Sequence, residues 1–313
     1  MTGSATTGRV ELTLGPVLFN WEPAAWRDFY LRIADEAPVD TVAIGEIVCS
    51  KRLALYAEHL PAVLDRLAAA GKTVLLSSLI LVTLDRERRQ MEELARSSDV
   101  LVEANDVSCL THLVGRPHAI GPFVNVYNEA TARFLAGRGA RRICLPPELP
   151  ATSIAAIAAA VPETRIEVFA FGRVPLAISA RCVHARLHGL TKDTCRFVCG
   201  EDADGLAVDT LDGEPFLAVN GVQTLSSSMA NLVESLDALA GMGVASCRLS
   251  PQTGDMVAAA RVFRAVLDGG AAPYAAPGAA RAELARLFPA VQFADGFLHA
   301  APGAEYRGAA PLP

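Results

Sequence analysis

The amino-acid sequence predicts an α/β fold, a (β/α)8-type barrel with a cysteine-rich insertion near the C-terminal ends of its strands. Short apolar runs alternate with helical stretches along the chain, in about eight repeated units. This alternation is typical of a parallel sheet that is covered by helices. An open doubly wound sheet is the alternative, but it would normally carry a glycine-rich phosphate loop after its first strand, and the sequence has none there.

The expected strands are short and apolar, and several contain β-branched residues, which suits strands that are buried on both faces. In chain order they span residues 10–19, 40–45, 73–76, 99–102, 119–126, 142–145, 166–171 and 244–249. A further run at 216–219 leaves the number of strands ambiguous.

The expected helices lie between these strands or after the last of them, and they have apolar residues at helical spacing. They span residues 28–37, 51–70, 85–96, 255–267 and 280–287. Gly71 ends the second helix and Gly269 ends the fourth, because glycine readily adopts the left-handed backbone found after a helix.

Three regions depart from this rhythm. Within a barrel domain of residues 9–270, residues 179–211 are polar, rich in Cys, His, Arg, Asp and Gly, and lack an apolar period, which indicates a functional insertion. Residues 271–313 are rich in Ala, Pro and Gly, and we expect them to wrap around the barrel. Residues 1–8 are polar and small, so we expect a disordered lead-in.

Composition and charge limit the function classes. The chain has 313 residues, 51% of them hydrophobic, and its formal net charge is -6. It therefore lacks the basic field that would favour nucleic acid as a partner. No segment reads as a secretory signal, and no apolar run reaches the roughly 18 residues that predict a transmembrane helix. We therefore expect a cytoplasmic protein.

Seven cysteines are present, an odd number in a large chain without an export signal. Metal binding or buried free thiols fit this pattern better than disulfides. Four cysteines lie in polar segments that follow expected strands, where barrel enzymes place their chemistry. They are Cys49, Cys182, Cys195 and Cys199. We expect these four cysteines to hold one metal centre.

The spacing of the four cysteines favours a [4Fe–4S] cluster over zinc. Cys195 and Cys199 are i and i+4, so on one helical turn their side chains would share a face about 5–6 Å apart. Zinc sites favour two tight pairs, and this sequence has one such pair. Neighbouring cations lower the pKa of thiols and favour the thiolate that binds metal. The neighbouring cations are Lys51, Arg52, Arg181 and Arg196. On these grounds alone, zinc stays open.

The other three cysteines sit in or beside apolar segments. They are Cys109, Cys144 and Cys247. Free cysteine is among the most frequently buried residue types, so we expect these three thiols to be packed in the core.

Several motifs resemble the collagenase-like peptidase family (peptidase family U, number thirty-two), and most closely its branch in oxygen-independent ubiquinone biosynthesis. The similarity extends from about residue 9 to residue 300, and the four-cysteine spacing is its specific part. The matching motifs are G-E-I-V-C-S-K-R at 45–52, P-P-E at 146–148, A-R-C at 180–182, K-D-T-C-R-F-V-C at 192–199, V-N-G-V-Q-T at 219–224, R-L-S-P-Q at 248–252 and G-F-L-H at 296–299.

The resemblance implies a [4Fe–4S] cluster on the four cysteines. It also implies a role as the iron–sulfur subunit in oxygen-independent hydroxylation of the ubiquinone precursor ring. Members of this branch act as heterodimers with a UbiU-type family member that carries its own cluster. A UbiT-type lipid-binding accessory protein belongs to the same pathway.

Polar residues at the ends of other strands are candidates for a catalytic site, since a barrel builds its substrate site there. The candidates are Glu46, Asn125, Glu148 and Arg248. Hydrogen bonds at the barrel rim and helix capping are the simpler explanation for such residues.

Two function classes remain open for the cluster. It serves electron transfer or substrate activation in a hydroxylase, or it is structural while the partner subunit carries catalysis. A zinc-stabilised, peptidase-like hydrolase is the third class. Peptidase chemistry is not expected, because His184 and His188 lack the glutamate of an H-E-x-x-H motif and no G-x-S-x-G motif occurs.

Overall fold

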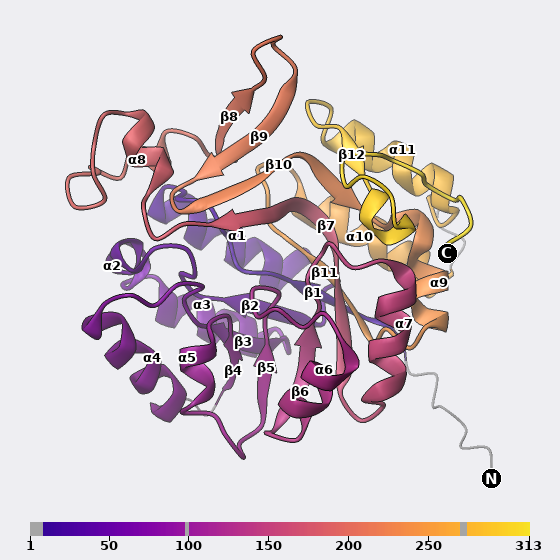
Figure 1. The fold of residues 1–313 in the computed structure, drawn as a ribbon, viewed down its shortest axis with the longest axis horizontal. Helices are drawn as coiled ribbons and strands as arrows, with labels where there is room; N and C mark the ends of the chain where they lie inside the picture. Colours follow the sequence, from indigo (N-terminus) through magenta and orange to yellow (C-terminus); the bar gives the residue numbers. More distant parts are fainter. Residues whose placement is uncertain (1–8, 98–99, 270–273) are drawn as a thin grey trace.

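The computed structural model describes residues 9–97, 100–269 and 274–313, so the lead-in expected at 1–8 lies outside the described residues. Within them, eight parallel strands form a closed barrel (Figure 1), and the predicted (β/α)8-type barrel is confirmed. The last strand, β11, pairs with both β7 and β1 and so closes the ring. The barrel strands are β1 (Glu11–Leu14), β2 (Thr41–Ile44), β3 (Thr73–Ser77), β4 (Leu101–Ala104), β5 (His118–Ile120), β6 (Ala140–Cys144), β7 (Arg165–Ile178) and β11 (Ser246–Leu249).

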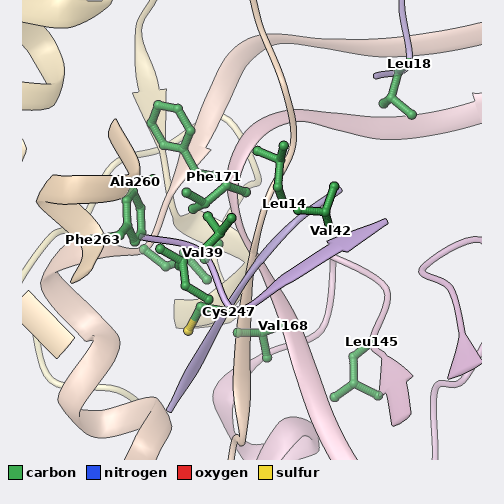
Figure 2. Packing of buried hydrophobic residues seen from close by; sticks show 14 of the residues in the cluster. Leu14, Leu18, Val39, Val42, Leu145, Val168, Phe171, Cys247, Ala260 and Phe263 are labelled. Carbon is green, nitrogen blue, oxygen red and sulfur yellow. The ribbon is translucent and has the colours of Figure 1, made fainter. Parts of the chain in front are cut away.

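Helices surround the barrel and bury its outer surface (Figure 1). The longer ones are α1 (Pro23–Glu36), α3 (Leu60–Ala69), α4 (Asp85–Ser97), α6 (Glu129–Ala136), α7 (Ala151–Ala160), α10 (Met256–Asp268) and α11 (Pro277–Leu287). The shorter ones are α2 (Leu53–Tyr56), α5 (Val107–Leu110) and α9 (Leu236–Gly241). Figure 2 shows Phe171 of β7 and Phe263 of α10 in this layer, where their rings meet edge to face at 5.6 Å. The thiol of Cys247 lies in the same layer (Figure 2).

The inside of the barrel holds a network of buried charges. Glu167 accepts hydrogen bonds from Arg248 and, at 2.7 Å, from Arg142. Arg248 also pairs with Glu103. Burial alone would raise the pKa of Glu167, but the two arginines outweigh it and lower this pKa to about 2. The barrel is therefore held by ion pairs at its centre and by apolar packing outside.

Beyond the barrel, β7 continues into an antiparallel arm. It pairs with β10 (Gln223–Asn231), which pairs with β9 (Pro215–Asn220), and β9 pairs with β8 (Leu206–Asp209). This arm projects from the barrel in Figure 1. The ambiguous run at 216–219 is therefore part of the arm and not a barrel strand. Between β7 and β8 lie the short helix α8 (Val183–Leu187) and the 3-10 turn η2 (Val198–Gly200).

The helix expected at 51–70 is broken in the structure. A 3-10 turn η1 (Ser50–Arg52) leads into α2, and α3 begins again at Leu60 with Pro61 in its first turn. A proline ring clashes with the preceding turn and lacks the N–H that a continuous helix needs. The chain after β2 is therefore divided into η1, α2 and α3 in place of one long helix.

The C-terminal residues 274–313 contain α11, the strand β12 (Phe293–Ala294) and the 3-10 turn η4 (Gly296–His299). Strand β12 pairs with β10, and Asp295 accepts hydrogen bonds from the N–H groups of Arg307 and Gly308. The end of the chain is thereby tied to the arm. Across the described part of the chain, no helix combines the length and the apolar character needed to cross a membrane.

Candidate metal centre

The loop after β2 presents Cys49. Gly45 has a φ of +143°, and a Cβ at this position would lie 2.7 Å from the backbone oxygen of Ser77. Glycine is therefore required where the chain leaves β2 alongside β3. The buried carboxylate of Glu46 then accepts hydrogen bonds from the N–H groups of Val48 (2.8 Å) and Cys49 (2.9 Å). These two bonds fold the loop around Glu46 and fix the backbone of Cys49.

The other three cysteines lie between β7 and β8. Cys182 caps the N-terminus of α8, and its Sγ accepts a hydrogen bond of 3.4 Å from the N–H of Ala185. Cys195 and Cys199 do not lie on one helical turn, the condition under which their side chains would share a face. Arg196 (φ 50°) and Phe197 (φ 57°) adopt left-handed backbone, and only the tight turn η2 follows. Left-handed backbone at these two residues interrupts a right-handed helix. The thiols of Cys195 and Cys199 therefore do not share a helix face, despite their i, i+4 spacing.

All four cysteines line one small pocket. The loop after β2 and the segment after β7 meet there, although they are more than a hundred residues apart in the sequence. The other lining residues include Arg52, His184, Lys192 and Phe197. Four thiols and three basic side chains therefore share one place at the barrel mouth.

Arg52 lies at the base of this pocket and is 1% exposed. Its Nη1 donates to the carbonyl of Leu18 and its Nη2 to Oδ1 of Asn220, both at 3.0 Å. Its Nε is buried and has no hydrogen-bond acceptor among the described residues. A sulfur-ligated anionic centre in the pocket would supply that acceptor. Sequence reasoning noted Arg52 as a neighbouring cation but had no signal for its burial.

Positive charge also approaches from the solvent side. Lys51 Nζ lies 3.7 Å from the Sγ of Cys195 and donates to the carbonyl of Lys192 at 2.7 Å. The pKa of the Cys49 thiol is raised by burial, and the N–H of Lys51 and the charge of Arg52 oppose this rise. The pKa of Cys182 is raised by burial and by the neighbouring thiols of Cys199 and Cys195. Without a cation in the pocket, Cys49 and Cys182 therefore resist becoming thiolates.

The two metals left open by the sequence, zinc and the iron of a [4Fe–4S] cluster, need different spacings of their sulfur ligands. A single tetrahedral zinc ion with Zn–S bonds of about 2.3 Å holds its sulfurs about 3.8 Å apart. The described part of the chain has one group of three or more possible metal-ligand atoms that all lie within 4.8 Å of one another. This group does not contain the four cysteines. No three of these four thiols therefore lie within 4.8 Å of one another.

That compact group consists of His184, His188 and Asp202. Nε2 of His184 lies 3.0 Å from Oδ2 of Asp202, and the two imidazole rings stack in parallel at 5.4 Å. Burial lowers the pKa of His184, and the Asp202 carboxylate opposes this shift. His184 is fully buried on α8, next to the cysteine pocket.

The catalytic candidates occupy different places. Glu46 supports the Cys49 loop, and Arg248 is buried in the barrel network. Asn125 is exposed beside a separate cavity that Asn105 also lines. Glu148 accepts a hydrogen bond from the hydroxyl of Tyr127. Of the candidates, Glu46 is the one whose carboxylate directly contacts the backbone of a pocket cysteine.

The three cysteines expected in the core are buried, which confirms that prediction. Cys109 and Cys144 are 0% exposed and Cys247 is 1% exposed. Burial raises the pKa of Cys247 to about 12 and that of Cys109 to about 11. These thiols lie apart from the pocket of the other four.

Comparison with solved structures finds distant likenesses. A glycoside hydrolase family 5 enzyme from Prevotella bryantii B14 is 9% identical with a TM-score of 0.40, and the alignment covers 88% of this chain and 97% of that chain. D-psicose 3-epimerase from Clostridium cellulolyticum H10 is 11% identical with a TM-score of 0.37, covering 90% and 99% of the two chains. A putative dihydrodipicolinate synthase family protein from Coccidioides immitis is 12% identical with a TM-score of 0.27, covering 51% of this chain and 60% of that chain.

Comparison with models of protein families gives a match over most of the chain. The model of peptidase family U32 matches residues 29–308, which include the four pocket cysteines and all barrel strands except β1. The chain therefore belongs to peptidase family U32.

Proposed function

We propose that the four pocket cysteines hold a [4Fe–4S] cluster and that the chain is a UbiV-type iron–sulfur subunit. In this function it is required for oxygen-independent hydroxylation of the ubiquinone precursor ring and acts with a UbiU-type partner in the cytoplasm. The observation that carries the proposal is the convergence of four thiols on one pocket, where no three of them lie within 4.8 Å of one another.

The residues around the pocket suit an anionic sulfur-rich group. A cluster held by four thiolates carries negative charge, and its potential depends on nearby charges and hydrogen bonds. Arg52 offers a buried charge and a free Nε–H, while Lys51 offers a charge at the rim. Such a cluster supplies one-electron redox chemistry when it is bound. With all four irons ligated by cysteine, this supports electron transfer or a structural role over direct binding of substrate to iron.

Hydrolase chemistry has weaker support. Of the residues singled out for a hydrolase, His184 is buried and pairs with Asp202, which leaves it poorly placed to activate water.

The assignment to oxygen-independent ubiquinone biosynthesis rests on the motifs around the cysteines, and so do the UbiU-type partner and the UbiT-type accessory protein.

The test is anaerobic purification of the chain, alone and co-expressed with a UbiU-type partner, followed by iron, acid-labile sulfide and zinc analysis and a visible spectrum. We expect about four irons and four sulfides per chain and a brown protein that bleaches on reduction. Stoichiometric zinc without sulfide would refute the cluster. Restoration of anaerobic ring hydroxylation in cells that lack the native subunit tests the biological role separately.

A further inference from the structure

A group of three possible metal ligands lies beside the cysteine pocket and has no part in the proposed function. His184 lies on α8, His188 follows directly after this helix, and Asp202 follows η2. One ligand atom from each residue lies within 4.8 Å of the other two. The two histidines lack the glutamate of an H-E-x-x-H motif, but that glutamate is the base of a protease and not a metal ligand. A metal site therefore does not need it.

The spacing of the three residues suits one metal ion. Histidines at i and i+4 on a helical turn share a face, and this pair is a common arrangement of zinc ligands. The two imidazole rings are nearly parallel, with 7° between their planes. Nε2 of His184 lies 3.0 Å from Oδ2 of Asp202. Two ligands of a tetrahedral ion with bonds of about 2.0–2.1 Å are about 3.3 Å apart. These two atoms are therefore separated about as two ligands of one ion are.

His184 has a buried ring nitrogen without a hydrogen-bond partner. Its side chain is 0% exposed, and Nδ1 lies 3.3 Å from the carbonyl oxygen of Val219, which can only accept. Nδ1 therefore carries the proton of that hydrogen bond. Nε2 is buried and forms no hydrogen bond within the described part of the chain, so Oδ2 of Asp202 is near it but is not placed to accept one. An unpaired buried nitrogen is costly, and a metal ion bound by Nε2 and Oδ2 would remove that cost.

The backbone that carries the ligands is held by contacts of its own. The ring N–H of Trp21 donates to the carbonyl of Ala203 at 2.7 Å, and the backbone N–H of Thr253 donates to Oδ1 of Asp204 at 2.8 Å. These two bonds fix the segment that presents Asp202. The helix α8 packs against β9 and η2. A hydrogen bond from the second ring nitrogen of a histidine to a backbone carbonyl is also what metal-bound histidines usually make. The ligands are thus positioned without help from the ion.

The ligand types decide the class of ion. Imidazole nitrogen suits zinc, iron and related divalent ions, whereas Mg²⁺ and Ca²⁺ are bound by oxygen ligands. His188 is exposed and the Asp202 side chain is 25% exposed, so water can fill the remaining coordination positions.

We propose that His184, His188 and Asp202 bind one divalent transition-metal ion, at a second site apart from the four cysteines. Cys182 caps α8 two residues before His184, and Cys199 stands three residues before Asp202. The ion would therefore join the two segments that carry these cysteines, and its role is structural. The proposal does not depend on which metal the cysteines hold.

Titration of Co²⁺ into the full-length chain tests the proposal, because the absorption spectrum of Co²⁺ reports its ligands. The Cys49→Ala/Cys195→Ala double variant is treated with EDTA first, so that the cysteine pocket lacks two of its four thiols. We expect one Co²⁺ per chain with weak visible bands, and without the intense near-ultraviolet band of a cobalt–thiolate bond. A spectrum dominated by the thiolate band would place the metal on the cysteines and overturn the proposal.

Competition identifies the class of ion. Zn²⁺ is expected to displace the bound Co²⁺, because it accepts the same imidazole and carboxylate ligands. Excess Mg²⁺ or Ca²⁺ is expected to leave the cobalt spectrum unchanged. Displacement by Mg²⁺ or Ca²⁺ at similar concentrations would overturn the assignment of a transition-metal ion.

Single substitutions locate the ion. His188→Ala removes an exposed ligand, and Asp202→Asn keeps the size of the side chain but removes its charge. We expect each to weaken Co²⁺ binding by about ten-fold or more. His112→Ala removes a histidine outside the group and is the matched control, with unchanged affinity. Unchanged binding in His188→Ala, or an equal loss in the control, would overturn the proposal.

The same substitutions are also made in the chain that keeps all its cysteines, so the result does not depend on the folding of the double variant. Circular dichroism of each variant shows whether it is folded. There, zinc content per chain after dialysis against Zn²⁺ is expected to fall by one ion in His188→Ala and to stay constant in His112→Ala. Equal zinc content in both variants would overturn the proposal.

Discussion

At the scale of single residues, two side chains connect the barrel mouth to the cysteines. Arg52 contacts the backbone near Leu18 and the side chain of Asn220, and Glu46 binds the loop of Cys49. Both side chains are buried, and their charged groups lie 4.0 Å apart. Each charge therefore offsets part of the desolvation cost of burying the other. The sequence singled out Glu46 and the cations because they stand next to a cysteine. It carried no signal that Asn220, far along the chain, completes the arrangement.

Replacement of single cysteines should separate ligands from core thiols. Cys49→Ala and Cys195→Ala are each expected to lose most of the iron, because each removes one of the four thiolates that would hold the cluster. Cys144→Ala removes a fully buried thiol outside the pocket and should keep the iron. Iron and sulfide analysis after anaerobic purification checks this. An equal loss of iron in Cys144→Ala would show that the seven cysteines are wrongly divided.

Arg52→Lys should weaken the support of the pocket while keeping a positive charge. Lysine cannot make the two separate contacts to Leu18 and Asn220, so we expect a loss of about 1–3 kcal/mol in the free energy of unfolding. Urea unfolding followed by circular dichroism measures it. Arg181→Lys, at an exposed position beside Cys182, is the control and should change stability by less than about 0.5 kcal/mol. Equal effects at both positions would contradict the structural role of Arg52.

At the scale of elements, the turns that leave the strands decide where the thiols lie. The strands themselves are short apolar runs, and most of them were recognised from the sequence. The turn after β2 depends on Gly45, and the path between Cys195 and Cys199 depends on two left-handed residues, Arg196 and Phe197. The i, i+4 spacing was compatible with a helical turn there, and it does not reveal backbone of positive φ in residues other than glycine.

Gly45→Ala should be destabilising at this turn. The added Cβ would lie 2.7 Å from the Ser77 oxygen on backbone with a φ of +143°, so we expect a cost of about 1–3 kcal/mol and a lower iron content. Thermal unfolding and iron analysis measure the two effects. Gly241→Ala in α9 meets no atom within 4 Å and should be neutral or stabilising by up to about 1 kcal/mol. A neutral Gly45→Ala would show that the turn can be made without glycine.

At the scale of the whole molecule, the barrel combines an ionic interior with an apolar outer layer. Glu167 receives hydrogen bonds from Arg142 and Arg248 at the centre, while the helices pack on the outer face of the strands. Patterns of hydrophobicity predicted the outer layer. They could not predict the ion network, because its members come from distant strands and meet only when the barrel closes.

Acid should weaken the fold through Glu167. Its pKa of about 2 lies below the ordinary 4.5, so the carboxylate stabilises the fold at pH values above its ordinary pKa. This contribution, about 3 kcal/mol, is lost as the pH falls from about 5 towards 2. Urea unfolding across this range measures it. Glu167→Gln should be less stable at pH 7 and show a shallower fall with acid, and an identical slope would contradict the assignment.

The working unit is expected to be a one-to-one heterodimer with a second barrel of the family. The described residues leave several large apolar side chains more than half exposed, which a partner would cover. They include Val107, Phe134, Leu187 and Phe216. Co-expressed with a UbiU-type protein, the chain should elute as a single complex in size-exclusion chromatography with light scattering. A stable, cluster-loaded monomer that restores ring hydroxylation without the partner would refute this.

The sequence by itself determined the barrel class, the family and the separation of four polar cysteines from three apolar ones. It could do so because apolar periodicity and local composition are properties of neighbouring residues. Only the tertiary structure decided which groups meet: Arg52 beside the cysteines, Glu46 against the backbone of Cys49, and Arg248 inside the barrel. These contacts join residues from distant strands, and their geometry depends on barrel closure and on turns with positive φ, which no local pattern specifies.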